Sequence, residues 1–131
     1  MNYLTLVEVA DVLSASLNFE AVTAGAIDES LSETVGVYQR EGLVPRECVG
    51  SFSSYETARL RLVLRWGISP TQAEAKAAKI ADIIGAFRNM PTASHRIIFT
   101  VIRAVRSMGK DSKGICEYVI DADIIYSERN E

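Results

Sequence analysis

The strongest constraint in this sequence is the alternation of side chains over residues 58–67, which read ARLRLVLRWG. Successive side chains of a β-strand point to opposite faces, so this segment is predicted to be a strand. Its apolar face consists of Leu60, Leu62, Leu64 and Trp66. Its other face consists of Arg59, Arg61, Val63 and Arg65. The strand therefore separates an apolar core from a basic surface.

A helix is predicted directly after this strand. Ser69 is a suitable N-cap, Pro70 suits the first turn, and Gln72 occupies the position of a capping-box partner. Apolar side chains then recur at helical spacing as far as about residue 88, and they are Ala73, Ala77, Ile80, Ile84 and Phe87. The residues NMPTASH that follow are expected to end this helix.

The same reading of the whole chain gives two helices and a sheet. The predicted elements are a helix over 3–16, a short extended piece over 19–22, strands over 34–40 and 58–67, a helix over 69–88, and strands over 96–105 and 115–127. We therefore predict an α+β fold: a two-layer domain in which both helices pack on one face of a mixed or antiparallel sheet of four to five strands. The 131 residues are expected to form a single domain, 1–131.

Charge and apolar runs exclude several classes of protein. Fourteen basic and 17 acidic residues give a net charge of −3, so the chain as a whole is not expected to attract nucleic acid. No apolar run approaches the roughly 20 residues that cross a bilayer, and Glu8 and Asp11 interrupt the N-terminal one, so neither a membrane nor a signal peptide is expected. Cys48 and Cys116 lie too far apart in the sequence for a zinc motif, which favours a reduced intracellular protein.

Residues 109–114, GKDSKG, contain the glycines and lysines of a phosphate-binding loop. Such a loop ends in Gly-Lys-Ser or Gly-Lys-Thr between a strand and a helix, whereas this segment leads into a strand. Asp111 and Ser112 are common turn residues, and Gly109 or Gly114 can adopt positive φ. The segment is therefore predicted to be the turn of a hairpin.

Three carboxylates, Glu117, Asp121 and Asp123, share one face of the last predicted strand. A nearly flat strand face does not supply the oxygen ligands that Ca²⁺ or Mg²⁺ requires, so we expect this face to meet water or a partner. His95 has no nucleophile or orienting acid suggested by the sequence and is expected on the surface, while Cys116 is expected to be buried. The sequence therefore predicts no catalytic site, no cofactor and no metal, and the chain is expected not to be an enzyme.

The three arginines of residues 58–67 allow two interpretations. They form a stripe that nucleic acid could contact, although the interleaved aromatic side chains of single-strand binders are missing. Alternatively, they pair with the acidic face of another strand, either within the sheet or across a subunit boundary, where opposite charges fix register. The second interpretation is favoured.

Four segments occur in a distinctive order. They are Val35-Gly36-Val37-Tyr38 before a glycine-containing loop, Tyr55 ahead of RLRLVLRWG, an alanine-rich helix from Ser69, and Met108-Gly109-x-Asp111-x-x-Gly114-x-x-Glu117 leading into the final strand. Together they resemble the small tail terminator, or minor capsid, proteins of long-tailed bacteriophages and phage-like particles. The resemblance extends from the first helix to Ser127.

The resemblance implies a non-enzymatic virion protein. Such proteins assemble, usually as six copies, into a ring that caps the tail tube, ends its polymerisation and joins the head or its connector. The implied partners are other copies of the chain, the tail tube protein, a head–tail connector or head completion protein, and genomic DNA that passes through without specific binding. Two alternatives remain: another neck component, such as a head–tail connector or tail completion protein, and a small ligand-binding regulatory domain.

The resemblance also assigns surfaces. The charged sheet face is expected at a subunit interface or at the lumen of the ring, through Arg59, Arg61, Arg65, Glu117, Asp121 and Asp123. Since DNA must pass without adhering, these arginines are predicted to pair with acids, and unpaired acids are predicted to line the hole. The loop over 41–56 is expected to contact a tube subunit or a ring neighbour through Leu43, Val44, Val49, Phe52 and Tyr55.

Overall fold

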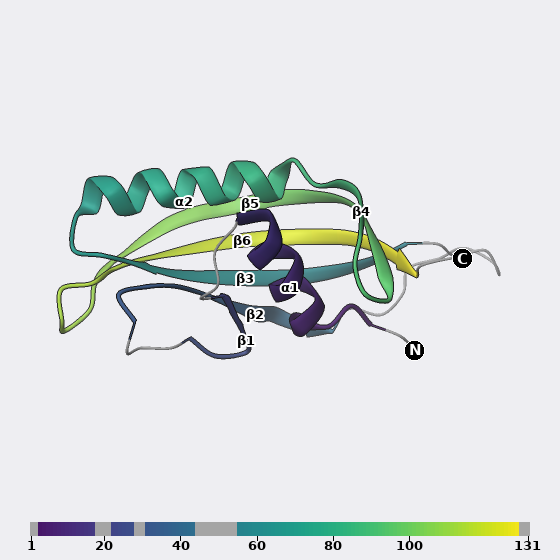
Figure 1. Ribbon diagram of the computed structural model, residues 1–131, viewed down its shortest axis with the longest axis horizontal. Coiled ribbons are helices and arrows are strands. Elements are labelled where there is room, and N and C mark those ends of the chain that lie inside the picture. Colours follow the sequence, from purple (N-terminus) through teal and green to yellow (C-terminus); the bar gives the residue numbers. More distant parts are fainter. Residues whose placement is uncertain (1–2, 18–21, 28–30, 44–54, 129–131) are drawn as a thin grey trace.

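The computed structural model describes residues 3–17, 22–27, 31–43 and 55–128 (Figure 1). Its elements, in chain order, are α1 (Leu6–Leu17), β1 (Val22–Ala24), β2 (Glu33–Leu43), β3 (Glu56–Trp66), α2 (Pro70–Gly85), β4 (Arg88–Pro91), β5 (His95–Lys110) and β6 (Cys116–Glu128). This content confirms the α+β class.

The described strands form one six-stranded sheet in the order β1-β2-β3-β6-β5-β4. Strand β1 pairs with β2 in parallel, and every other pair is antiparallel, so the sheet is mixed. The long strands β5 and β6 form a hairpin, as predicted. The sheet twists along these strands, so the domain departs from a flat two-layer stack (Figure 1).

Both helices pack against one face of the sheet. Helix α1 contacts β1 and β2, whereas α2 contacts β5, β6 and β3. The alternation of β3 is confirmed, because Leu60, Leu62 and Leu64 are buried in the same apolar core as both helices. This leaves one sheet face without a helix in the described part of the chain, and we call it the open face.

The start of α2 follows the predicted capping pattern. The Ser69 hydroxyl accepts a hydrogen bond from the backbone N–H of Gln72, and Pro70 occupies the first turn. The predicted stripe is buried, with Ala73, Ala77, Ile80 and Ile84 facing the sheet. Helix α2 has 16 residues, and no described helix is long and apolar enough to cross a membrane.

The number of strands and several element boundaries differ from the prediction. The sheet has six strands instead of four to five, because residues 88–91 form β4 and pair with β5 after α2 ends at Gly85. Strand β2 runs to Leu43, into the predicted loop, and β5 runs to Lys110. Pairing with long neighbours extends these strands beyond what their own sequence patterns indicate.

The segment at 109–114 is the predicted turn. A carboxylate oxygen of Asp111 accepts hydrogen bonds from the backbone N–H groups of Lys113 and Ile115, at 2.8 and 2.9 Å. Gly109 and Gly114 have φ values of 82° and 81°, which glycine adopts at little cost. Because β6 follows it directly, this turn lacks the helix N-terminus of a phosphate-binding loop.

Candidate functional site: a charged cluster on the open sheet face

The two sets of charged residues predicted from the sequence lie on neighbouring strands. In the antiparallel pairing of β3 with β6, Arg59 lies opposite Asp123, Arg61 opposite Asp121, and Arg65 opposite Glu117. All six belong to the open face, because the residues that alternate with them form the core. The strand order therefore brings together arginines and acids that are more than 50 positions apart in the sequence.

Asp121 lies between two arginines from different strands. Its carboxylate accepts hydrogen bonds from Arg61 Nε at 2.8 Å and Arg61 Nη2 at 3.3 Å, and from Arg106 Nη2 at 3.3 Å. The hydrogen bond from Arg61 is the main cause that holds the pKa of Asp121 below its usual value. The same contact raises the pKa of Arg61. Both shifts favour the charged forms of the pair.

Asp123 lies between a second pair of arginines. Arg40 on β2 donates to Oδ1, and Arg103 on β5 donates to Oδ2 through its Nε at 2.8 Å. Four strands thus contribute to one group of side chains. We call it the arginine–aspartate cluster, and its members are Arg40, Arg61, Arg103, Arg106, Asp121 and Asp123.

The arginines of this cluster cover the aspartates. Both carboxylates are buried, whereas the side chains of Arg103 and Arg106 are 58% and 52% exposed. Four arginines against two aspartates leave a formal excess of two positive charges. The predicted pairing of arginines with acids is therefore present at Asp121 and Asp123, because a buried carboxylate requires charged donors and here has them. That unpaired acids line the hole of a ring stays a prediction.

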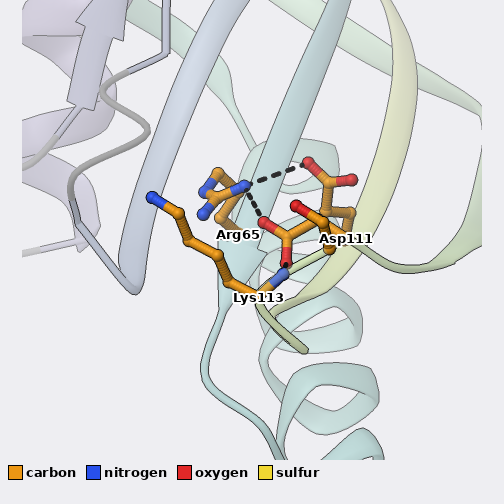
Figure 2. A pocket seen from close by; sticks show the side chains of 5 residues that line it. Arg65, Asp111 and Lys113 are labelled. Atoms are coloured by element: carbon orange, nitrogen blue, oxygen red, sulfur yellow. Dashed lines mark hydrogen bonds and ion pairs between the residues drawn. The ribbon is translucent and has the colours of Figure 1, made fainter.

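Arg65 belongs to a separate group at the end of β3 (Figure 2). Its buried guanidinium lies 2.6 Å from Asp111 and 3.5 Å from Glu117. The pKa of Asp111 is lowered, mainly by the backbone N–H of Ile115 and also by Arg65. A polar hollow of about 220 Å³ adjoins these residues, lined also by Ser112 and Lys113. Arg65 thus fixes the β5–β6 turn against the sheet.

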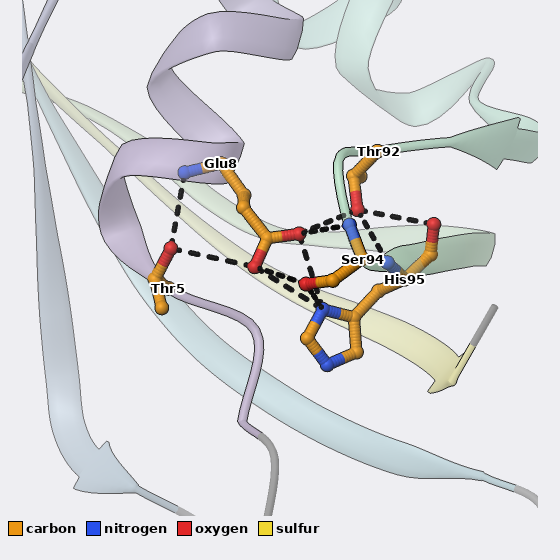
Figure 3. Close-up of polar contacts among 5 residues, drawn as sticks. All are labelled: Thr5, Glu8, Thr92, Ser94 and His95. Carbon is orange, nitrogen blue, oxygen red and sulfur yellow. Dashed lines mark hydrogen bonds and ion pairs between the residues drawn. The ribbon is translucent and has the colours of Figure 1, made fainter.

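A second polar group joins the first helix to the β4–β5 hairpin (Figure 3). Both carboxylate oxygens of Glu8 lie within 3.2 Å of His95 Nδ1, and Glu8 also accepts hydrogen bonds from the Thr92 hydroxyl at 2.7 Å and from the Ser94 backbone at 3.1 Å. The Thr5 hydroxyl accepts from the Glu8 backbone N–H and begins α1. The expectation that His95 lies on the surface is wrong, since its exposure is 0%.

The charge of Glu8 is set by these contacts. Burial alone would raise its pKa, but the hydrogen bonds from Thr92, His95 and Ser94 outweigh burial and lower the pKa to about 2. A catalytic relay would place an acid on one imidazole nitrogen and a nucleophile on the other. Here Ser94 Oγ and Glu8 both approach His95 Nδ1, so these contacts hold α1 and the β4–β5 hairpin together.

Three further predictions concern Cys116, metal binding and the partner loop. Cys116 is buried, as predicted. Within residues 3–17, 22–27, 31–43 and 55–128, no group of three or more His, Cys, Asp or Glu side chains is arranged to hold a metal ion. For the predicted partner loop, Leu43 is the last residue of β2, Tyr55 is exposed, and Val44, Val49 and Phe52 lie outside the described residues.

Three members of the cluster were not identified from the sequence. Arg40 lies 83 positions from Asp123, and no local pattern relates the two residues. Arg103 and Arg106 lie in β5, which was predicted to be a strand from its apolar side chains and not from its charges. Bulges near residues 103 and 108 also shift the pairing of β5 with β6, so simple alternation does not give the face on which these arginines lie. Residues 88–110 contain no acid, and this could have indicated that their arginines pair with acids elsewhere in the chain.

No family model and no curated protein sequence matches the chain. Its fold is similar to that of a chain in the solved structure described as "Virion of native gene transfer agent (GTA) particle", with a TM-score of 0.55 and 14% sequence identity. This alignment covers 90% of the present chain and 85% of the other. A second solved structure, at 13% identity, covers 95% of this chain and 90% of its own with a TM-score of 0.49, which is too low to support an argument. The first likeness shows a shared fold.

Proposed function

We propose that this chain is a structural protein of a phage-like particle. The observation that carries this proposal is the fold likeness to a chain of a gene transfer agent virion over 90% of the present sequence. The sequence resemblance to tail terminators, which rests on different observations, points to the same class.

Within that class, the proposed role is that of a ring that caps the tail tube, ends its polymerisation and provides the surface that joins the head. The arginine–aspartate cluster supports a role in assembly, since arginine is enriched at the centres of protein interfaces and acts there through its planar fork. Its exposed guanidinium groups keep donors available to a partner. In this proposal the chain is not an enzyme, and its ring has six copies.

Tube polymerisation provides the test. The tail tube protein of the same particle is polymerised with increasing amounts of this chain, and tube lengths are measured by negative-stain electron microscopy. We expect the mean length to fall, because each cap ends the growth of one tube, and native mass measurement should show a six-copy species on or off the tube. An unrelated protein of similar size and net charge serves as the control.

The alternatives predict different results. Unchanged tube lengths together with binding to the connector would favour another neck component over a terminator. Unchanged lengths, no ring, and a monomer whose melting temperature rises with nucleotides or divalent metals would contradict the proposal and favour a small ligand-binding domain.

A further inference from the structure

Strand β5 has an outer edge that the other described strands leave mostly unpaired. The strand order ends with β6, β5 and β4, and β4 pairs with β5 only from Arg96 to Phe99. From Thr100 to Lys110, β5 therefore has β6 on one side and no described strand on the other. Residues 105–110 of this stretch are all exposed. The backbone N–H and C=O groups of such an edge form a template on which a further strand can pair.

This edge carries positive charge and no negative charge. Residues 88–110 contain no acid, and the unpaired stretch of β5 carries Arg103, Arg106 and Lys110. The two arginine side chains are more than half exposed, although each also contacts an aspartate of β6. Charged side chains on a sheet edge prevent it from pairing with an identical edge. Here they repel the β5 edge of a second copy and attract an acidic strand.

The aspartates of β6 hold these two arginines in place. Asp123 accepts a hydrogen bond from Arg103 Nε at 2.8 Å, and Asp121 accepts one from Arg106 Nη2 at 3.3 Å. Each contact uses part of a planar guanidinium, whose five N–H donors allow it to bind a second carboxylate as well. A side chain that is already fixed loses less conformational entropy when it binds a partner. The arginines are therefore preorganised for an acidic group that approaches from outside the sheet.

The bulge near residue 103 sets the spacing of these charges. It adds one residue to β5, so Arg103 and Arg106 both reach the open face although they are three positions apart. Their acceptors, Asp123 and Asp121, are two positions apart on β6. A regular strand beside β5 matches the arginines with acids two positions apart, since such residues share one face. The residue between those acids lies on the other face, on the side of exposed Val105.

We propose that the outer edge of β5 binds an extended acidic segment of another protein, in which acids alternate with apolar residues. The segment adds a strand to the sheet. Its main chain bonds to β5 and gives affinity, while its carboxylates meet Arg103 and Arg106 and its apolar side chains meet Val105, which gives specificity. The inference rests on the proposed function, because it names the chemistry of a partner in particle assembly.

Two other occupants fit this edge less well. A nucleic acid strand cannot continue the backbone hydrogen bonds of a β-sheet, and it leaves exposed Val105 and Met108 without an apolar contact. Methionine and arginine are instead enriched where proteins meet. An identical β5 edge from a second copy brings arginines against arginines and is disfavoured. An acidic strand matches both the backbone and the charge of the edge.

Binding of synthetic peptides to the purified full chain tests the inference. The probe is a short fluorescent peptide in which glutamate and valine alternate. One control peptide has lysine in place of glutamate, and a second has the glutamates grouped at one end and the valines at the other. A third has a central proline, which removes a backbone donor and disrupts strand pairing. Fluorescence anisotropy at low salt measures affinity, and backbone amide hydrogen exchange locates the site.

We expect the alternating glutamate–valine peptide to bind and to protect amides within residues 100–110. Its binding should weaken as salt is added. The three control peptides should bind on the order of 10-fold to 100-fold more weakly. All four peptides are compared on the wild-type chain, so this part of the test does not depend on how a variant folds.

Substitution of the two arginines provides a second measurement. Arg103→Gln with Arg106→Gln should weaken binding of the alternating peptide on the order of 100-fold. The matched control, Lys76→Gln with Lys79→Gln, removes two positive charges from α2, on the other side of the sheet, and should bind as wild type does. Circular dichroism and thermal melting establish that both variants fold.

Several results would overturn the inference. These are equal binding of the glutamate and lysine peptides, equal binding of the proline peptide, protection confined to amides outside residues 100–110, or unchanged affinity in the folded arginine variant. Protection of the same amides by a DNA oligonucleotide but not by the peptide would assign the edge to nucleic acid. Protection of these amides by self-association, with no competition from the peptide, would assign it to a second copy.

The peptide test and the tube-length test can fail separately. If the alternating peptide binds at β5 but tube lengths do not change, the proposed function fails and the inference stands. If the chain shortens tubes but no acidic peptide binds at β5, the inference fails and the proposed function stands.

Discussion

Glu8 is the residue whose charge contributes to stability in the most clearly defined pH range. Its pKa is lowered from 4.5 to about 2 in the folded chain. A lowered carboxyl pKa stabilises the fold above the unfolded value, and this contribution is lost as the pH falls through the folded value. The free energy of unfolding should therefore decrease between about pH 4.5 and pH 2 by roughly 2–3 kcal/mol because of this group.

The variant Glu8→Gln isolates this effect. It retains an acceptor for Thr92 but has no charge for His95, so we expect it to be less stable than wild type at pH 7 and to lose less stability on acidification. Urea unfolding at several pH values measures both quantities. Parallel pH profiles for wild type and Glu8→Gln would show that the Glu8 carboxylate has no such role.

Asp121 and Arg106 form one ion pair but should differ in their effect on stability. Asp121 is buried between Arg61 and Arg106, so Asp121→Asn leaves two guanidinium groups without a counter-charge and should cost about 2–4 kcal/mol. Arg106 is half exposed, and Arg106→Gln should cost at most about 1 kcal/mol. Chemical denaturation of the two single variants tests this order, and equal losses would contradict it.

At the scale of the elements, the β5–β6 turn depends on one backbone conformation. Gly114 has a φ of 81°, and a Cβ added there would meet nothing within 4 Å, so any cost of substitution comes from the backbone alone. We expect Gly114→Ala to lower the free energy of unfolding by about 1 kcal/mol and Gly114→Asn to cost less, because asparagine tolerates this region. Thermal or urea unfolding measures both, and a stabilising Gly114→Ala would contradict the prediction.

Elements that are specified by adjacent residues were predictable, and elements that depend on distant partners were not. The alternation of β3 and the Ser69 cap of α2 are local patterns, so the sequence alone predicted them. Strand β4 has no such pattern, since Asn89 and Pro91 are poor strand residues, and it forms because β5 lies beside it. His95 was misplaced for the same reason: its partner Glu8 is 87 positions away.

At the scale of the whole molecule, the sequence predicted the α+β class and the single sheet face that carries charge. It did not predict how that charge is distributed between buried and exposed atoms. The acids at 121 and 123 were expected at the surface, yet arginines from β2 and β5 cover them. Only the strand order brings these four strands together, and strand order is a property of the complete sheet.

The hydrogen bonds between Glu8 and the β4–β5 hairpin also have a consequence for the order in which contacts form during synthesis. The partners of the Glu8 carboxylate on α1, which are Thr92, Ser94 and His95, are made 84 to 87 residues after Glu8. At about 5–20 residues per second, Glu8 waits roughly 4–17 seconds for them. The contact between Glu8 and the β4–β5 hairpin therefore cannot form until β5 has been made, although α1 can already pack against β1 and β2.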